Sequence, residues 1–186
     1  MYYQNPYWYW TDAVDDKWIK KIHTLVKKKN LKSALVGTEL REDENIRKSK
    51  IAFIEEEWVS NKLKPFIDTA NKSANWNFEW FRMEAIQYTE YGLNEFYNYH
   101  LDSHVVPTKN NRQRKVSVVV SLNNSSEYEG GQFKMMLDPN RVIEVKELKR
   151  KGTVIVFPSN IWHKVEPITK GKRYSLVGWC EGFDFK

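Results

Sequence analysis

Three potential metal ligands occur at every second position in the stretch FYNYHLDSHV, which covers residues 96–105. They are His100, Asp102 and His104, and the chain has only four histidines in all. On a β-strand, side chains two positions apart lie on one face, with their Cα atoms roughly 6.5 Å apart. An imidazole nitrogen and a carboxylate oxygen at that spacing can reach one metal ion. The alternative is a polar strand face that binds nothing.

His163 is the candidate for a third ligand, because it follows the predicted strand GTVIVF (152–157) and a short turn. Two histidines and one carboxylate on one side of a metal form a facial triad. This arrangement leaves three coordination positions open and is characteristic of non-haem Fe(II) oxygenases. No cysteine lies near these residues, so a structural zinc site is not expected.

A cation suited to a carboxylate follows His163 by ten residues. It is Arg173, in the stretch GKRYSLVGW. An Fe(II) oxygenase that activates O₂ needs electrons, and a bound 2-oxo acid can supply them. A dicarboxylate co-substrate then needs a cation at its far end, and the arginine fork binds carboxylate through two hydrogen bonds. Ser175 shares the face of Arg173 on a strand, and its hydroxyl could donate to the same carboxylate.

These residues lie within a series of motifs that resembles the 2-oxoglutarate/Fe(II)-dependent dioxygenases, specifically the prolyl-4-hydroxylase-like branch. In chain order the motifs are YGLNEFYNYHLD, RKVSVVVSLN, YEGGQF, GTVIVFPSNIWHKVEPITKGKRYSLVGW and the closing EGF. Each motif alone is weak, but their order and spacing together are specific. The resemblance extends from about Ile46 to Phe185, which is about three quarters of the chain.

The resemblance implies a double-stranded β-helix (jelly-roll) core with supporting N-terminal helices. It implies Fe(II) on His100, Asp102 and His163. It also implies 2-oxoglutarate on the iron, with its distal carboxylate on Arg173 and Ser175. No catalytic side chain is implied beyond these metal and co-substrate ligands. Ascorbate is expected as the reductant.

Three aromatic residues match family positions. Tyr91 matches a tyrosine whose hydroxyl can reach 2-oxoglutarate, Tyr97 one that lines the substrate side, and Trp179 an aromatic that walls the site. Tyr91 and Trp179 are equally consistent with core aromatic residues. The family assigns no ligand role to His104. A fourth protein ligand would obstruct the positions that 2-oxoglutarate and O₂ need, so we expect His104 to stay off the iron.

The resemblance also implies hydroxylation of an unactivated C–H bond, with release of succinate and CO₂. A prolyl residue in a protein or peptide is the first choice of substrate, and the polar segment 103–115 could be a mobile loop over it. Hydroxylation of a free amino acid or another small molecule is the alternative. Nucleic-acid demethylation ranks third, since the basic charge permits it without selecting it. A non-catalytic jelly-roll binding module would need a lost ligand or a lost cation, and the sequence keeps both.

Two amphipathic helices are predicted in the first part of the chain. Residues 12–29 place apolar side chains at helical spacing, with Asp12 as the N-cap. Residues 55–73 form the second predicted helix, in which Pro65 predicts a kink or a break. The stretch 49–54 between them reads as a strand.

After residue 76 the pattern becomes that of short strands separated by turns, which is typical of a sandwich or barrel. Gly130 and Gly131 are expected to permit a turn or a bulge beside a strand. The turns are DPN (138–140), FPSN (157–160) and TKG (169–171). The predicted strands are 78–91, 95–105, 114–123, 130–137, 141–146, 152–157, 162–167 and 172–182.

The composition predicts one globular domain over residues 1–186, and the helix and strand patterns predict the α+β class. Together with the resemblance they imply helical support over about 1–75 and a jelly-roll core over about 76–186. The 15% aromatic share argues against disorder. Cys180 is the only cysteine, which excludes an intrachain disulfide and favours a reducing compartment.

No apolar run of transmembrane length and no signal-peptide pattern is present, so we expect a cytoplasmic protein without membrane contact. The net charge of +6 comes partly from basic clusters at 27–32, 109–115 and 146–151. We interpret these clusters as solvated faces, and nucleic acid is not an expected partner. The expected partners are O₂, 2-oxoglutarate and a protein or peptide substrate.

Overall fold

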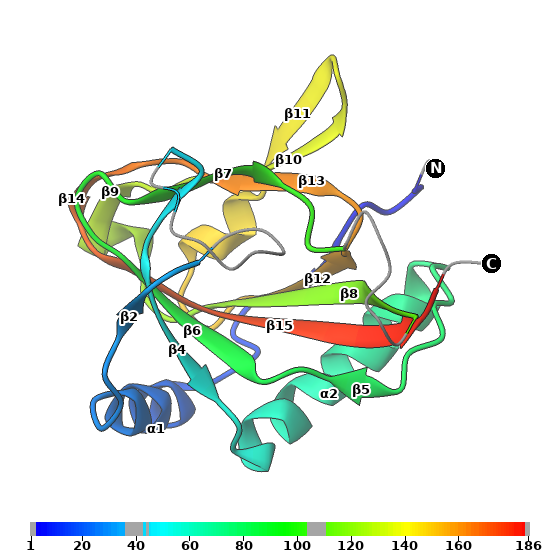
Figure 1. Cartoon of the computed structure of the whole chain (residues 1–186), viewed down its shortest axis with the longest axis horizontal. Helices are drawn as coiled ribbons and strands as arrows, with labels where there is room; N and C mark the ends of the chain where they lie inside the picture. Colours follow the sequence, from blue (N-terminus) through cyan, green and yellow to red (C-terminus); the bar gives the residue numbers. More distant parts are fainter. Residues whose placement is uncertain (1–2, 36–42, 44, 104–110, 185–186) are drawn as a thin grey trace.

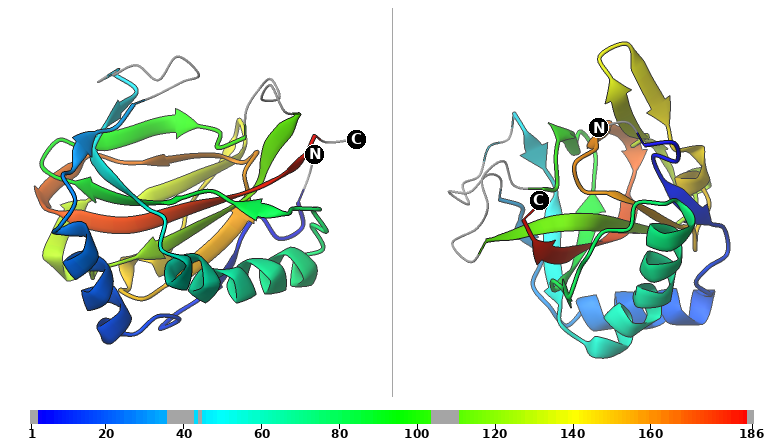
Figure 2. Two further views of the ribbon diagram at one scale, coloured as in Figure 1. Left: turned by 60° about the horizontal axis from the view of Figure 1, so that its bottom comes forward. Right: turned by 90° about the vertical axis from the view of Figure 1, so that its right-hand side faces the viewer.

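The computed structural model of the protein describes residues 3–35, 43, 45–103 and 111–184. Within these residues, two large antiparallel sheets face one another, and two helices cover the outer face of the larger sheet (Figure 1). Two further views show both helices on the same side of the molecule (Figure 2). The predicted α+β class is confirmed.

The larger sheet contains eight strands among the described residues, seven of them in the order β1-β12-β8-β15-β6-β4-β2, with β5 pairing beside this path with β15. Every pairing is antiparallel. The strands are β1 (Trp8–Trp10), β2 (Lys32–Ser33), β4 (Lys50–Ile54), β5 (Arg82–Met83), β6 (Ile86–Tyr91), β8 (Arg112–Ser121), β12 (Val154–Pro158) and β15 (Arg173–Phe183).

The smaller sheet has the strand order β11-β10-β13-β7-β3, and β14 pairs with β9 in a separate ribbon. The β10–β11 hairpin projects from the body of the molecule (Figure 1). The strands are β3 (Arg47–Lys48), β7 (Phe96–His100), β9 (Tyr128–Gly130), β10 (Phe133–Asp138), β11 (Arg141–Glu144), β13 (Trp162–Val165) and β14 (Ile168–Gly171). Short 3₁₀ turns cover Ser125–Glu127 and Lys146–Lys149.

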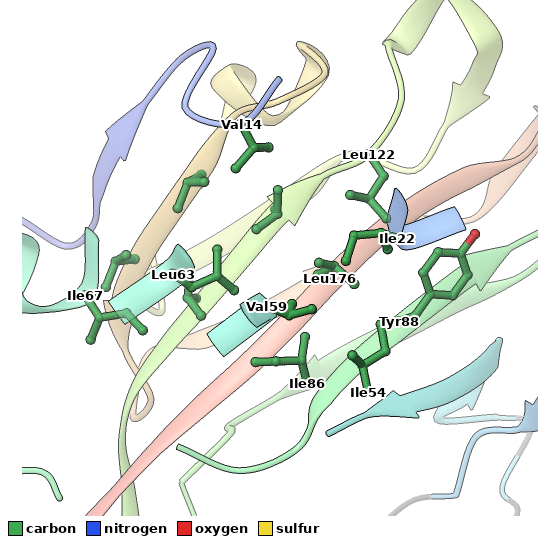
Figure 3. Packing of buried hydrophobic residues seen from close by; sticks show 14 of the residues in the cluster. Val14, Ile22, Ile54, Val59, Leu63, Ile67, Ile86, Tyr88, Leu122 and Leu176 are labelled. Carbon is green, nitrogen blue, oxygen red and sulfur yellow. The ribbon is translucent and has the colours of Figure 1, made fainter. Parts of the chain in front are cut away.

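The helices α1 (Asp16–Val26) and α2 (Glu57–Ser73) bury one apolar stripe each against the larger sheet. Ile22 of α1 and Leu63 of α2 are fully buried and point toward sheet residues such as Leu176 (Figure 3). Burying a side chain of this size contributes about 1.5–3 kcal/mol. This layer fixes the sheet that carries half of the site described below.

The run VSVVV in strand β8 is buried on both faces of the sheet. Successive side chains of a strand point to opposite faces. Val118 and Val120 therefore pack beneath the helices, while Val119 points between the two sheets. Both faces of this strand are covered. The sequence therefore lacks the alternation of apolar and polar residues that marks a strand with one exposed face.

The predicted helix boundaries need correction. α1 begins at Asp16, and Asp15 caps it by accepting a hydrogen bond from the Trp18 backbone nitrogen at 2.7 Å. The predicted cap, Asp12, has a φ of +53° and instead forms an ion pair with Arg150. α2 runs unbroken through Pro65, which lies on the exposed face, where water can satisfy the carbonyl that the proline ring leaves unpaired.

Several predicted strands are shorter or divided. The expected strand 78–91 is two strands, β5 and β6, and the expected strand 95–105 ends at His100. The turn expected at 169–171 belongs to β14 instead, because it pairs with β9. Of the loop proposed at 103–115, residues 112–115 belong to β8, and 104–110 lie outside the described residues. None of the described helices is long and apolar enough to cross a bilayer.

Candidate metal centre

Two of the predicted ligands lie opposite each other on neighbouring strands. His100 ends β7 and is the register partner of His163 on β13. Asp102 lies two residues beyond the end of β7, in a bend rather than on the strand. The expectation that His100 and Asp102 share a strand face is therefore wrong, although the structure still brings both together with His163. His104 falls outside the described residues.

The three side chains converge on one small volume between the two sheets. One ligand atom from each of His100, Asp102 and His163 lies within 4.8 Å of the other two. The Nε2 atom of His100 is 3.6 Å from Oδ1 of Asp102, and Nε2 of His163 is 3.5 Å from Oδ2. The side chains are only 13%, 5% and 5% exposed, in the order His100, Asp102, His163. This donor set suits a divalent transition metal.

Backbone contacts fix the tautomer of both imidazoles. Nδ1 of His100 lies 2.8 Å from the carbonyl oxygen of Asn98, and Nδ1 of His163 lies 2.8 Å from that of Ile161. A carbonyl can only accept, so each Nδ1 carries the hydrogen. Both Nε2 lone pairs are therefore free to face Asp102, which is the arrangement that metal-binding histidines need.

The local electrostatics favour the metal-binding protonation states. Burial, helped by the neighbouring His163, lowers the pKa of His100 to about 3, so this imidazole is neutral at pH 7. Burial also acts to raise the pKa of Asp102. The two histidines, Arg114 and a hydrogen bond from Ser117 outweigh that effect, and the net pKa of Asp102 is lowered. A neutral imidazole beside a carboxylate can accept a cation without first losing protons.

The predicted co-substrate residues Arg173 and Ser175 line the same pocket as the three metal-cluster residues. Arg173 is only 2% exposed, and its Nη1 atom is 3.4 Å from the hydroxyl of Ser175. Its Nη2 atom is buried without a hydrogen-bond partner in the described part of the chain. An unsatisfied buried donor is costly, so this site fits an anionic ligand that would accept from it. A dicarboxylate such as 2-oxoglutarate meets that requirement.

The three predicted aromatic residues also line this pocket. The ring of Tyr91 lies 5.7 Å from the Arg173 guanidinium carbon. Tyr97 stacks on His100 with ring centroids 3.5 Å apart. Trp179 is covered by the guanidinium of Arg114 at 3.9 Å. All three positions are compatible with the roles expected for them, but they pack against protein groups as well.

Arg47 and Ser117 are among the polar residues at the site that no sequence pattern identified. Arg47 lines the pocket, donates from Nε to the Ser49 hydroxyl at 3.0 Å, and lies over Tyr97. It comes from the region predicted only to support the core, and no pattern marks it. Ser117 donates to Asp102 at 2.7 Å. Its signal was a hydroxyl within an otherwise β-branched run.

A larger hollow elsewhere does not share this chemistry. It lies between the segment near Tyr3 and the β10–β11 hairpin. None of the metal-cluster residues lines it, and neither does Arg173.

The family assignment follows from a match between residues 86–181 and the family described as the 2OG-Fe(II) oxygenase superfamily. This region is just over half of the chain and contains all three cluster residues and Arg173. The chain belongs to this superfamily. Its metal and co-substrate are therefore Fe(II) and 2-oxoglutarate, as the sequence predicted, and the donor set and the unsatisfied arginine fit both.

Curated relatives include PKHD-type hydroxylases. The protein IL0759 of Idiomarina loihiensis is 28% identical over 105 residues, which cover 54% of this chain and 43% of that protein. The protein Syncc9605_1577 of a Synechococcus species is 32% identical over 90 residues, or 48% of this chain and 38% of that protein. The matched region thus spans less than half the length of these relatives.

Solved structures with the same fold include prolyl hydroxylases. One is a Trichoplax adhaerens prolyl hydroxylase in complex with a peptide fragment of the hypoxia inducible factor oxygen degradation domain. It has a TM-score of 0.76 and 19% identity, covering 97% of this chain and 84% of that one. A Pseudomonas putida prolyl-4-hydroxylase has a TM-score of 0.72 and 22% identity, covering 96% and 94%. The predicted double-stranded β-helix is confirmed.

Gly131 lies close to the side chain of Arg173, and a substitution at Gly131 tests this packing. Its φ is +63°, and an added Cβ would lie 2.5 Å from Cδ1 of Ile168 and 3.1 Å from Cδ of Arg173. We expect Gly131→Ala to lower the free energy of unfolding by at least about 1 kcal/mol, from the left-handed backbone alone. Denaturant unfolding would measure it.

Gly92→Ala is the matched control, because its added Cβ meets only the Glu95 carboxylate, at 3.6 Å and beyond. It should change stability far less. Equal effects of the two substitutions would contradict the assigned geometry at Gly131.

Proposed function

We propose that this protein uses Fe(II), 2-oxoglutarate and O₂ to hydroxylate a prolyl residue in a protein or peptide. The overall reaction converts a C–H bond to an alcohol, while 2-oxoglutarate is oxidised to succinate and CO₂. One observation carries the proposal. The His100–Asp102–His163 cluster and the unsatisfied guanidinium nitrogen of Arg173 line the same pocket.

We assign the metal to the Nε2 atoms of His100 and His163 and to a carboxylate oxygen of Asp102. Two imidazoles and a carboxylate leave coordination positions open for co-substrate and O₂. When bound, iron and 2-oxoglutarate supply the oxidising power for the C–H bond, and the protein supplies position and surroundings.

The remaining pocket residues have binding and shielding roles in this proposal. Arg173 and Ser175 bind the distal carboxylate of 2-oxoglutarate, and the Tyr91 hydroxyl reaches the same co-substrate. Phe133 and the other apolar side chains of the pocket keep water from the reacting atoms. Tyr97 and Trp179 line the pocket, where the exposed parts of their rings can contact a prolyl ring.

An extended substrate is favoured by the position of Arg47. This residue lines both the metal pocket and a surface hollow that Ser33, Lys48 and Glu95 also line. A peptide could place one residue at the metal and continue across the surface beyond Arg47. That a prolyl hydroxylase of similar fold is seen with a peptide supports this choice.

A free amino acid is the second candidate, and Arg47 again provides the reason. The Arg47 side chain lines the metal pocket, and its guanidinium group carries five N–H donors. The carboxylate of an amino acid would suit such a group.

The metal assignment predicts that succinate formation requires all three ligands. His100→Ala, Asp102→Ala and His163→Ala should each reduce succinate production from 2-oxoglutarate, with Fe(II) and ascorbate present, to the level of protein-free controls. His23→Ala removes the partly buried imidazole that contacts Tyr88 instead, and it should retain activity. Succinate formed at the parental rate by any ligand variant would refute the assignment.

The co-substrate assignment predicts a selective loss of 2-oxoglutarate binding. Arg173→Ala should raise the KM for 2-oxoglutarate roughly 10- to 100-fold, since a hydrogen bond to a charged group is worth about 1.5–3 kcal/mol. Arg173→Lys should lie between it and the parent, because lysine keeps the charge but not the fork. Arg82→Ala removes a side chain that is 58% exposed and should leave KM unchanged. An unchanged KM in Arg173→Ala would exclude this role.

The substrate is tested by incubating the iron-loaded protein with a cell lysate, 2-oxoglutarate and ascorbate. Mass spectrometry should find peptides that gain one oxygen atom on proline, and these should be absent with Asp102→Ala. Turnover of free amino acids without any modified peptide would instead favour the second candidate.

A further inference from the structure

Asp102 differs from the two histidines in how its position is fixed. His100 and His163 belong to paired strands of the smaller sheet. Asp102 follows the end of β7, so no strand pairing holds it. A carboxylate on a bend needs other contacts to keep one orientation, because its backbone and side-chain torsions are otherwise free.

Those contacts come from strand β8 of the larger sheet and from Ser159, which directly follows β12. The Ser117 hydroxyl of β8 donates to Oδ2 of Asp102 at 2.7 Å and lies 2.8 Å from the hydroxyl of Ser159. The carbonyl of Ser159 accepts from the backbone nitrogens of Asp102 and Ser103, both at 3.0 Å. Ser159 is itself tied to β8, since its nitrogen donates to the carbonyl of Lys115 at 3.0 Å. Both serines are fully buried.

The direction of this small network follows from its members. An ionised carboxylate can only accept, so the single hydroxyl hydrogen of Ser117 points to Asp102. The hydroxyl of Ser159 must then donate to the oxygen of Ser117. The chain of donors therefore runs from Ser159 through Ser117 to Oδ2, and it uses one acceptor direction of that oxygen.

We propose that Ser117 and Ser159 are positioning residues that hold the Asp102 carboxylate in its metal-binding orientation. This inference rests on the proposed metal site. The hydroxyl pair couples a ligand on a bend to the larger sheet, while the two imidazoles are held by the smaller one. By occupying part of Oδ2, the pair also disfavours chelation through both oxygens, which would consume a coordination position that the reaction needs.

The test is Co(II) binding to the metal-free protein, followed by absorption, because it requires no substrate and no turnover. Ser117→Ala should weaken Co(II) binding roughly 10- to 100-fold and alter the Co(II) absorption spectrum, as loss of an outer-shell partner does. Ser159→Ala should have a smaller effect in the same direction, because Ser117 can still donate. Ser117→Thr keeps the hydroxyl and should restore most of the affinity.

Ser121→Ala is the matched control. Ser121 lies on the same strand and is equally buried, but its hydroxyl donates to the carbonyl of Asn123. It should leave Co(II) affinity and spectrum unchanged. If Ser117→Ala and Ser159→Ala both bind Co(II) as Ser121→Ala does, the positioning role is overturned, whatever their thermal stabilities.

A further variant separates this inference from the proposed function. Asp102→Ala should lose Co(II) affinity and change the spectrum more than either serine variant. If Asp102→Ala binds Co(II) like the parent, the proposed metal site itself is wrong. If Asp102→Ala loses binding while Ser117→Ala keeps it, only the role of the serines fails.

Discussion

The packing of the smaller sheet against the larger one is the constraint on which the site depends. His100 and His163 lie on the smaller sheet, whereas Arg173, Ser175 and Ser117 lie on the larger one. The metal cluster and the buried arginine can share a pocket only while the two sheets keep their spacing. A close-packed apolar layer maintains it, formed by residues of both sheets such as Phe133, Phe157 and Val165. Its rigidity is what allows reacting groups to be held within a fraction of an ångström.

The larger sheet serves two environments at once. On one face, valines and isoleucines pack beneath α1 and α2 in an ordinary core. On the other, the same strands present arginine, serine and tyrosine to the pocket. Thr89 and Ser175 are register partners on β6 and β15, and both are buried on that inner side. The helices thus stabilise a sheet whose inner face carries polar groups that apolar packing alone would exclude.

Much of this arrangement could be predicted because some chemistry is local in sequence. The spacing of His100 and Asp102, the arginine ten residues after His163, and the order of motifs were sufficient for the metal, the co-substrate and the fold. The geometry behind one step was nevertheless wrong, since β7 ends before Asp102. A period-2 pattern cannot show where a strand stops pairing, because pairing depends on a distant partner.

What the sequence could not show were contacts made across the fold. Arg47 reaches the pocket only because β3 pairs with β7, and nothing near residue 47 signals that neighbour. The N-cap was predicted at Asp12 and lies at Asp15, three positions later, because the sequence pattern allows either aspartate to begin the helix. The unbroken α2 shows that burial of a helix face can override the preference of one proline.

The close approach of Gly131 to Arg173 has a consequence for which acids the pocket accepts. A Cβ added at Gly131 would lie 3.1 Å from Cδ of Arg173, and the hydroxyl of Ser175 lies 3.4 Å from its Nη1 atom. The stem of Arg173 therefore has little room to move toward Gly131, which limits how far the distance between this cation and the metal cluster can change. The distance between the cation and the metal cluster therefore determines which length of dicarboxylate can contact both. An acid with a longer carbon chain would have to buckle to reach both ends, and a shorter one could reach only one of them.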